Sequence, residues 1–458
     1  MRKRIISLVV ILTLVLTLVP NVTFATSATD KFEVTINGQV TKYQTAVDAV
    51  NAVPNDGTPA TIKLLDNYEG GGVQVKDGQN ITFNLDKHTW KITNPLVGST
   101  GTETNAFQLL KGATVTFKDG KITSSIAMII FQNYCDLTVD SIDASLTTAR
   151  EGNYVMSNNN GKTVIKNSTI TASKTGLAMD SFTFGDYKGG DVVIGEGAII
   201  NGDIEVANGG KMNIAAGIVN GDIHVYNYKY DASSDKVPEL KVTGGSIDGK
   251  VLAENKGQVV VDGSVVRELA VNKGEGHSAN ITVKSGTFEK GGEGIDIDNA
   301  NVVVLEDKEG KIVNVVGKEY ITSILKIAKE EDMLKSIRVL SAEEGMNFDV
   351  ADGVTVENKS GNVINVNNKP LAVGDSITVE PPKAPVNPDE ENTPVVPGDK
   401  EDLSSDNNHH QEDLNDASKN DKDKEKGPQT GDNTAVMLLA MLMVASGSLA
   451  LILKKTTK

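Results

Sequence analysis

Few side chains in this sequence could carry acid–base chemistry, and they lie far apart. Proton removal from a uronic acid needs a base, commonly Arg or Lys, beside a Ca²⁺ held by carboxylates. Beyond residue 25 the chain has three arginines, none of which adjoins three acids at strand spacing: Arg150, Arg267 and Arg338. The acids Asp296 and Asp298 alternate on one face of an expected strand, which is more typical of a solvated surface. We therefore predict no catalytic residue.

Candidate metal ligands are equally sparse. The single cysteine, Cys135, excludes an internal disulfide framework and a cysteine-based zinc site. The histidines share no ligand spacing along the chain: His88, His224, His277 and the pair His409–His410. One group of aspartates could supply hard oxygen ligands for Ca²⁺ from a single loop: Asp180, Asp186 and Asp191. We predict no metal and no cofactor, with calcium in this loop as the alternative.

Charge and composition exclude some partners. The formal net charge is −16, and a strongly acidic chain binds nucleic acid poorly, so we predict no nucleic-acid partner. Aromatic residues make up only 4% of the chain, with one tryptophan. We therefore expect few aromatic platforms on which a sugar could stack.

The body of the chain is built from short strands separated by glycine and asparagine turns. Between positions 110 and 290, an alternating apolar strand, a turn and a second short strand recur at unequal intervals. Such variation fits a solenoid with fixed strands and variable loops better than a helical repeat of constant length. We expect the apolar residue after each turn to point inward: Ile122, Ile142, Ile170, Ile199, Ile218, Ile247, Val265 and Phe288.

Stacking of these units would bury what no single unit can bury alone. Aligned coils place Val and Ile in continuous interior columns, and Gly or Asn at the corners tolerates positive φ. We predict an all-β fold in which residues 26–300 form a parallel β-helix solenoid. An antiparallel β-sandwich, with hairpins at a spacing of about 8–12 residues, is the alternative. The segment resembles the right-handed parallel β-helix of pectate-lyase-like proteins.

The start of the coil has its own pattern. Apolar residues from Tyr43 to Val53 fall near helical spacing, and Pro54 to Gly57 form a stop signal. A Thr-Ile-x-Leu strand follows in residues 60–67. A small helix followed by such a strand resembles the opening of many β-helix surface proteins, in which the helix caps the N-terminal end of the coil.

A similar opening recurs near residue 320. At one constant offset and without a gap, Thr61–Leu65 falls on Ser336–Leu340 and Val75–Gly78 falls on Val350–Gly353. A helical pattern from Ile321 to Leu334 precedes the second copy. We predict that residues 301–380 form a small α+β segment, which is either a degenerate second start of the coil or a cap on its C-terminal end.

The two ends of the chain carry apolar segments. Met1–Arg4 is basic, Ile5–Val19 is apolar and Ala25 is small, so we predict a secretory signal peptide over residues 1–25 with cleavage at Ala25. Near the other end, residues 381–426 are rich in Pro, Asp, Glu, Asn and Lys, and we predict a disordered acidic stalk. The apolar run 435–453 is long enough to cross a membrane as a helix, with a basic tail on the cytoplasmic side.

Residues 427–458 contain a short motif before this span. The order Pro428-Gln429-Thr430-Gly431, apolar span and lysines resembles the sorting signal of sortase-anchored wall proteins. In that family a transpeptidase cuts between Thr and Gly and joins the Thr carboxyl to peptidoglycan, so the matching bond is Thr430–Gly431. Gly427 stands where that family usually has Leu. A retained membrane anchor is the alternative.

These features together predict where the protein acts and on what. We expect a cell-surface protein of a Gram-positive bacterium, attached to wall or membrane, non-enzymatic, and either adhesin-like or structural. The expected partners are a sortase, peptidoglycan, the membrane through the C-terminal span, and a host or neighbouring-cell glycan or protein. A secreted polysaccharide lyase or glycosidase of the β-helix class is the alternative.

Overall fold

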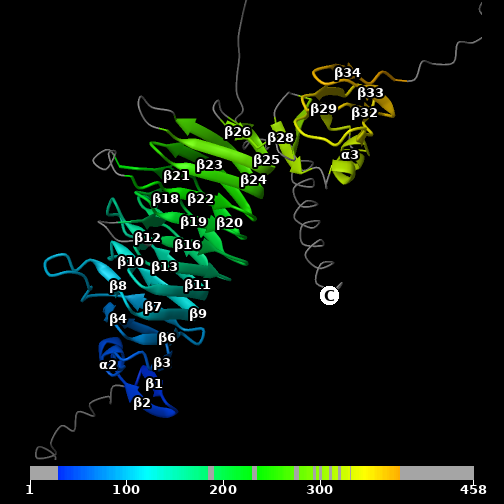
Figure 1. Cartoon of the computed structure of the whole chain (residues 1–458). Coiled ribbons are helices and arrows are strands. Elements are labelled where there is room, and N and C mark those ends of the chain that lie inside the picture. Colours follow the sequence, from blue (N-terminus) through cyan, green and yellow to red (C-terminus); the bar gives the residue numbers. More distant parts are fainter. Residues whose placement is uncertain are drawn as a thin grey trace, which may run out of the picture.

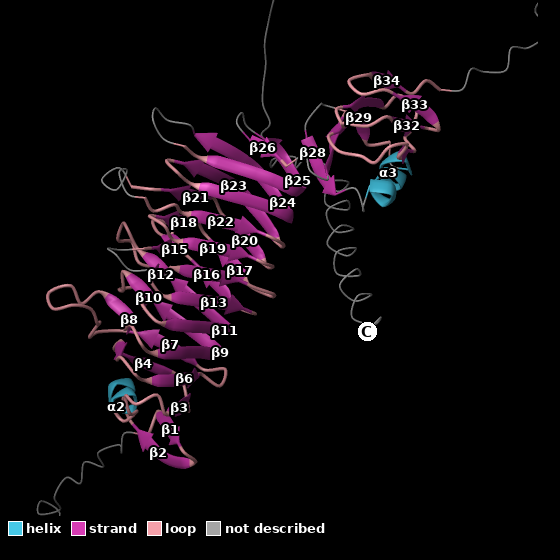
Figure 2. Cartoon of the chain, viewed as in Figure 1, coloured by secondary structure: helices cyan, strands magenta, loops and turns pink. Residues whose placement is uncertain are grey.

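The structure, a computed structural model, describes residues 29–183, 190–228, 235–272, 278–291, 295–298, 302–308, 312–317, 321–330 and 332–381. The described chain is mostly β, with one long sheet in which parallel pairs dominate (Figures 1 and 2). The all-β prediction is confirmed, and the strand arrangement is consistent with a β-helix-like solenoid.

The strands of successive coils pair into three parallel ladders. Ladder A comprises β3 (Pro59–Leu64), β6 (Asn80–Asn84), β9 (Thr114–Ser124), β11 (Asp136–Leu146), β13 (Lys162–Lys166), β16 (Asp191–Ile194), β19 (Lys211–Ile214), β22 (Glu239–Val242), β24 (Gln258–Asn272), β25 (Asn280–Gly291) and β26 (Ile295–Ile297). Ladder B comprises β4 (Tyr68–Gly70), β7 (Thr89–Ile92), the second halves of β9 and β11, β14 (Thr169–Thr171), β17 (Ile199–Asn201), β20 (Ile218–Asn220), β23 (Ser246–Glu254), and then β24 and β25.

Ladder C carries the candidate site described below. It comprises β5 (Val73–Val75), β8 (Asn105–Leu109), β10 (Ile129–Asn133), β12 (Tyr154–Asn159), β15 (Leu177–Phe182), β18 (Ile204–Ala207), β21 (Ile223–Tyr226) and the later parts of β23 and β24. Because every neighbour is parallel, residues at the same position in successive coils stack directly on one another.

The interior column of ladder B corrects part of the prediction. The stacked, buried residues are Ile122, Ala144, Ile170, Ile200, Val219, Ile247, Val266 and Phe288. Ile142 is buried in the same core, as predicted, but outside this column, whereas Val265 is only partly buried. Ile199 and Ile218 point outward and are 36% and 43% exposed. Ile199, Ile218 and Val265 are each followed directly by a second apolar residue, and it is this second residue that is buried. Because side chains alternate along a strand, a prediction that is wrong by one residue places the side chain on the opposite face.

The N-terminal end of the coil is closed by a hairpin and a helix (Figure 1), and an aromatic cluster fills the coil behind them. β1 (Phe32–Ile36) pairs antiparallel with both β2 (Gln39–Tyr43) and β3. Helix α2 (Ala46–Asn51) begins after Thr45, whose Oγ1 accepts from the Asp48 amide at 3.1 Å. Beneath them, aromatic rings contact one another across coils: Phe32, Tyr68, Phe83, Trp90, Phe107, Phe117 and Phe131. These rings fill the first coils, whereas Val, Ile and Met fill most of the later ones.

A second copy of this opening lies near the other end. Its elements are β27 (Val302–Asp307), β28 (Ile312–Gly317), α3 (Ile321–Glu330), β29 (Leu334–Val339), β30 (Asn347–Phe348), β31 (Thr355–Asn358), β32 (Ile364–Val366), β33 (Lys369–Leu371) and β34 (Ser376–Thr378). Strands β27 and β28 form an antiparallel hairpin, β27 pairs antiparallel with β29, and β29 pairs parallel with β31. Strands β1, β2, β3 and β6 pair in the same way.

The constant offset seen in the sequence holds for the elements themselves. It carries the first residue of α2 onto that of α3 and both bounds of β3 onto those of β29. The register differs, however, because Thr61 pairs with Thr82, whereas its counterpart Ser336 pairs with Thr355, a partner two positions nearer along the chain. A slip of two positions keeps the same side chains inside. The second copy then stops, since β31 pairs antiparallel with β34 and no further coil follows in the described residues.

The β27–β28 hairpin belongs to two hydrophobic cores. Val304 and Val315 are buried in the core of the coil, whereas Val303, Leu305 and Val316 are buried in a second core with α3, β29 and β31. Alternation along one strand therefore joins the second copy to the coil.

The predicted terminal features lie outside the described residues. These are the signal peptide with Ala25, almost all of the acidic stalk, the sorting motif Pro428–Gly431, the apolar span 435–453 and the basic tail. Across the part of the chain that is described, no helix has both the length and the apolar character needed to cross a bilayer.

The duplication provides a matched pair of glycines for a stability test. Gly78 and Gly353 both adopt positive φ, 76° and 83°. A methyl group at residue 78 would collide with the carbonyl oxygen of Asn55, whereas one at residue 353 would meet no atom within 4 Å. We expect Gly353→Ala to cost about 1–2 kcal/mol for the backbone alone, and Gly78→Ala to cost about 1–3 kcal/mol more because of the collision. Urea unfolding followed by circular dichroism measures the unfolding free energy of both variants. Equal losses of stability would contradict the collision inferred at residue 78.

Candidate functional site

One outward column of ladder C is polar from β5 to β21. The residues stacked in register are Gln74, Gln108, Gln132, Ser157, Asp180, Glu205 and His224. The glutamines satisfy one another, since Gln74 Nε2 donates to Gln108 Oε1 at 2.6 Å and Gln108 Nε2 donates to Gln132 Oε1 at 3.2 Å. After Ser157 the column continues with two carboxyl groups, Asp180 and Glu205, in place of amides. Acidic side chains can bind cationic groups, which amides bind less well.

Asp180 is the least satisfied member of the column. Its side chain faces out from the coil, yet the residue is only 8% exposed. Oδ2 accepts from Ser157 Oγ at 3.0 Å, whereas Oδ1 is buried without a hydrogen-bond partner among the described residues. The pKa of Asp180 is raised to about 7, chiefly by burial and to a smaller extent by Glu205, while the Ser157 hydroxyl and the Asn158 amide oppose this rise. None of these groups is a cation, so the carboxyl has no counter-ion among them.

Three tyrosines lie near the two carboxyl groups. Tyr228 Oη lies 3.5 Å from Glu205 Oε2, and Tyr226 and Tyr154 are close enough for Glu205 to raise their pKa values. Burial, the larger cause, raises the pKa of Tyr154 to about 12 and that of Tyr226 well above its ordinary value. All three tyrosines are half-buried. We call Ser157, Asp180, Glu205, Tyr154, Tyr226 and Tyr228 the acidic–aromatic cluster.

Further aromatic rings extend the cluster along ladder C. The Tyr226 and Tyr228 rings meet edge to face at 5.2 Å, and Tyr228 also lies 5.7 Å from Phe182. Within β21, the His224 ring stacks on Tyr226 at 3.9 Å. His224 Nε2 is 3.0 Å from Glu254 Oε2, so this histidine faces a carboxylate of its own. Aromatic residues are few in the whole chain, but the rings of Phe182 and Tyr228, from separate coils, meet at this face.

Most of the residues considered for catalysis from the sequence lie far from one another in the structure. Arg267 lies 3.6 Å from Asp248, and Arg338 contacts Glu306 and Glu357 at 3.1 and 3.2 Å. The remaining candidates are the exposed Arg150, and Asp296 and Asp298 in and just after β26. No arginine is among the groups that act on the Asp180 carboxyl.

The metal candidates do not assemble among the described residues. Asp180 lies on β15 of ladder C and Asp191 begins β16 of ladder A, while Asp186, His277 and His409–His410 lie outside the described residues. Over that same part of the chain, no group of three or more His, Cys, Asp or Glu residues could hold a metal ion. Burial raises the pKa of the Cys135 thiol to about 12, so this cysteine is not a reactive thiolate.

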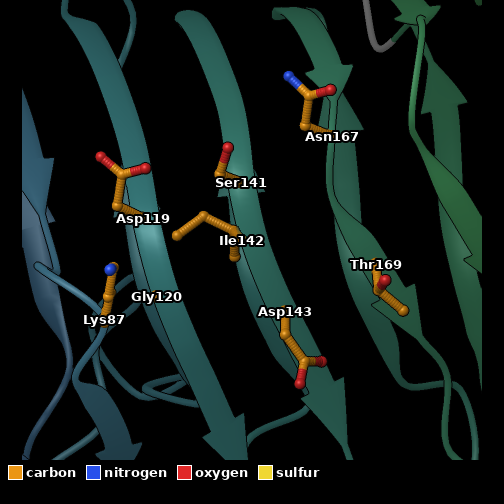
Figure 3. Close-up of a pocket in the computed structure, with 8 residues that line it drawn as sticks. All are labelled: Lys87, Asp119, Gly120, Ser141, Ile142, Asp143, Asn167 and Thr169. Atoms are coloured by element: carbon orange, nitrogen blue, oxygen red, sulfur yellow. The ribbon is translucent and has the colours of Figure 1, made fainter.

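A cavity lies on another side of the coil, at the corner between ladders A and B (Figure 3), and has a volume of about 460 Å³. Its lining residues come from successive coils: Lys87, Asp119, Gly120, Ser141, Ile142, Asp143, Asn167 and Thr169. Asp143 pairs with Lys121 at 2.8 Å and Asp119 with Lys118 at 3.5 Å. Since these acids already have cationic partners, the acidic–aromatic cluster is the stronger candidate for a ligand site.

Comparison with known proteins adds no relative from which a function could be transferred. No family model matches the chain, and no curated protein or solved structure matches it. The site therefore has to be judged from its own geometry.

The sequence indicated Asp180 only as a possible Ca²⁺ ligand and did not indicate the other members of the acidic–aromatic cluster. Tyr154 and Ser157 lie together on β12, whereas Glu205 lies on β18 two coils later, and none of them carries a local motif. The one signal available was the Tyr226-Asn-Tyr228 sequence directly at the end of a strand, in a chain that has nine tyrosines.

The burial of Asp180 predicts a dependence of stability on pH. The pKa is about 7 in the folded state, against an ordinary value of 3.8. The folded state therefore keeps a proton that the unfolded chain releases, so this contribution is fully present below pH 3.8 and is lost as the pH rises through 7. We expect the unfolding free energy to fall about 2–3 kcal/mol more for the wild type than for Asp180→Asn between about pH 5 and pH 8.

Thermal or urea unfolding across this pH range tests the prediction. Asp143→Asn removes an exposed, paired acid from ladder B and is the matched control, which should follow the wild type. Parallel pH profiles for the wild type and Asp180→Asn would show that Asp180 is ionised in the folded protein.

Proposed function

We propose that this protein is a non-enzymatic, cell-surface β-helix that binds a glycan along the outward face of ladder C. The observation that carries the proposal is the column of hydrogen-bonding side chains in register, flanked by half-buried tyrosines. Strands of neighbouring coils lie roughly 4.8 Å apart, which is close to the length of one sugar unit in an extended chain. Polar groups that orient hydroxyls beside apolar rings are what sugar recognition requires.

The charge of the cluster restricts the class of glycan. Asp180 and Glu205 occupy neighbouring strands, and no cation of the described residues acts on the Asp180 carboxyl. A polyuronate would bring further negative charge to a partly desolvated site, which is unfavourable. The proposed ligand is therefore a neutral or amino-bearing glycan, as host or neighbouring-cell surfaces present. The same charge disfavours a lyase, because elimination from a uronate needs a cationic group or a metal at the acid.

Attachment to the cell completes the proposed role. The coil would be a right-handed parallel β-helix of the pectate-lyase-like kind, exported by the signal at residues 1–25 and raised on the acidic stalk. The sorting motif would let a sortase join Thr430 to peptidoglycan, with the apolar span 435–453 holding the chain in the membrane beforehand. This assignment rests on the motif order in the sequence.

A glycosidase is the second candidate, and the acid pair favours it. Carboxyl groups on adjacent strands are separated by roughly the 5 Å typical of retaining glycosidases. The raised pKa of Asp180 suits a proton donor. Release of reducing ends from a neutral oligosaccharide, abolished in Asp180→Asn, would replace binding with catalysis.

Truncation of a tyrosine tests the binding face. Tyr228→Ala removes the ring that meets Tyr226 and Phe182, and we expect glycan affinity to fall about tenfold, the equivalent of about 1.4 kcal/mol. Ile218→Ala changes an exposed apolar residue on ladder B and is the control, with unchanged affinity expected. Binding of the purified protein to a panel of neutral, amino and uronic oligosaccharides gives the measurement. An equal loss of glycan affinity in both variants, or no binding to any oligosaccharide of the panel, would show that the outward face of ladder C is not the binding site.

The anchor is tested on native cells. We expect wall fragments released by muralytic digestion to contain a C-terminal peptide that ends at Thr430 and carries a cross-bridge fragment. Mass spectrometry identifies this peptide by its mass. A peptide that continues through Gly431 into the apolar span would instead show a membrane-held protein and remove the sortase from the proposal.

A further inference from the structure

We propose that the acidic–aromatic cluster binds a primary ammonium group, so that the ligand is a glycan containing hexosamine units with free amines. This inference rests on the proposed glycan-binding function and specifies which chemical group the site selects. Its basis is the geometry around Asp180 and Glu205.

The first observation is the missing counter-ion. Asp180 and Glu205 are register partners on β15 and β18, and each influences the same tyrosine, Tyr154. Among the described residues, the groups acting on Asp180 are a hydroxyl, an amide and the second acid, Glu205. Two acids that share a partly desolvated site repel each other, and a cation placed between them removes that repulsion.

The second observation is the unpartnered oxygen. Asp180 Oδ1 is buried and accepts no hydrogen bond from the described part of the chain, whereas Oδ2 already accepts from Ser157. A buried acceptor without a donor is costly, and a ligand N–H group directed at Oδ1 would satisfy it. A quaternary ammonium has no N–H to donate. A primary ammonium supplies both the charge and the donor, which is why we assign the ligand to this class.

The third observation is the aromatic wall. Tyr154, Tyr226 and Tyr228 lie near the acids, and the ring of Phe182 lies 5.7 Å from that of Tyr228. A cation within about 6 Å of such rings is attracted by their negative faces, most strongly where water is excluded. Each of the three tyrosines is only half-buried, so part of it remains open to solvent. A charged amine can therefore approach along ladder C, with its sugar lying against the exposed parts of the rings.

The fourth observation is a contrast within the same column. At Gln74, Gln108 and Gln132 the chain places amides that hydrogen-bond to one another. At Asp180 and Glu205, positions equivalent in register, it places acids instead, although amides would avoid the repulsion. The change from neutral to acidic side chains occurs where the tyrosines gather, which points to recognition of a cation at that place.

The test compares two ligands that differ only in charge at nitrogen. Calorimetric titration of the purified full-length protein uses a glucosamine tetrasaccharide and its fully N-acetylated counterpart, at physiological salt and near pH 7, where Asp180 is partly ionised. We expect the free amine form to bind at least tenfold more tightly. Asp180→Asn should abolish this preference and leave weak binding of both forms, and Glu205→Gln, a half-buried position, should reduce it.

Two controls separate recognition by the cluster from general attraction between charges. Because the chain has a net charge of −16, a cationic oligomer could be attracted without a site, and Asp143→Asn tests this by removing one exposed acid from ladder B. The preference should survive in that variant, and a loss equal to that in Asp180→Asn would overturn the inference. Tetramethylammonium should compete poorly, and competition as strong as that of a primary amine would assign the site to quaternary ammonium instead.

The outcomes separate this inference from the function on which it rests. Equal affinity for both tetrasaccharides would overturn the ammonium assignment and leave glycan binding intact. Binding of neither form, nor of any oligosaccharide in the wider panel, would overturn both. A preference for the free amine that depends on Asp180 and Glu205 but not on Asp143 supports both.

Discussion

Parallel hydrogen bonding in register between successive coils is the constraint on which the rest of the structure depends. Each side chain lies over the equivalent side chain of the neighbouring strand. A position that faces the interior in one coil therefore faces the interior in the next coil as well. Inside, this produces continuous columns such as Ile170, Ile200 and Val219. Outside, it makes neighbours of residues that are far apart in sequence. The acidic–aromatic cluster is a direct product, since Ser157, Asp180 and Glu205 meet only because their strands are in register.

The same constraint creates a problem at each end of the coil, where strands lack a partner. At the N-terminus a hairpin and α2 cover the first coil, and the aromatic rings fill the space beneath. Residues 302–381 use the same order of elements, with a hairpin, α3 and β29, but close after β31 by antiparallel pairing with β34. Because β27 contributes alternate residues to two cores, the copy is joined to the coil through side chains as well as the chain itself.

How much could be predicted from the sequence follows from the range of each interaction. Strand period, turn residues and the constant offset between the two openings are patterns visible along the chain, and they predicted the mostly β fold and the placement of β29. The prediction of the inward-facing residue was wrong at Ile199, Ile218 and Val265. At each of these places two adjacent residues are apolar, and only the register with the next coil determines which of them faces the interior. The cluster was out of reach for a different reason. Its members are separated by loops of unequal length, so no fixed spacing connects Ser157 to Asp180, Glu205 and His224.

The presence of a buried acid on an outward face needs a physical reason. Burial disfavours the charged carboxylate, and a free buried acceptor adds to the cost, so Asp180 is destabilising at neutral pH compared with the amides of the same column. The glutamine ladder shows that this fold can fill the column without such a cost. A solenoid whose interior columns already supply its stability can tolerate an unfavourable residue on one outer face. The acid pair is then best understood as a local departure from stability that a bound cation would reverse.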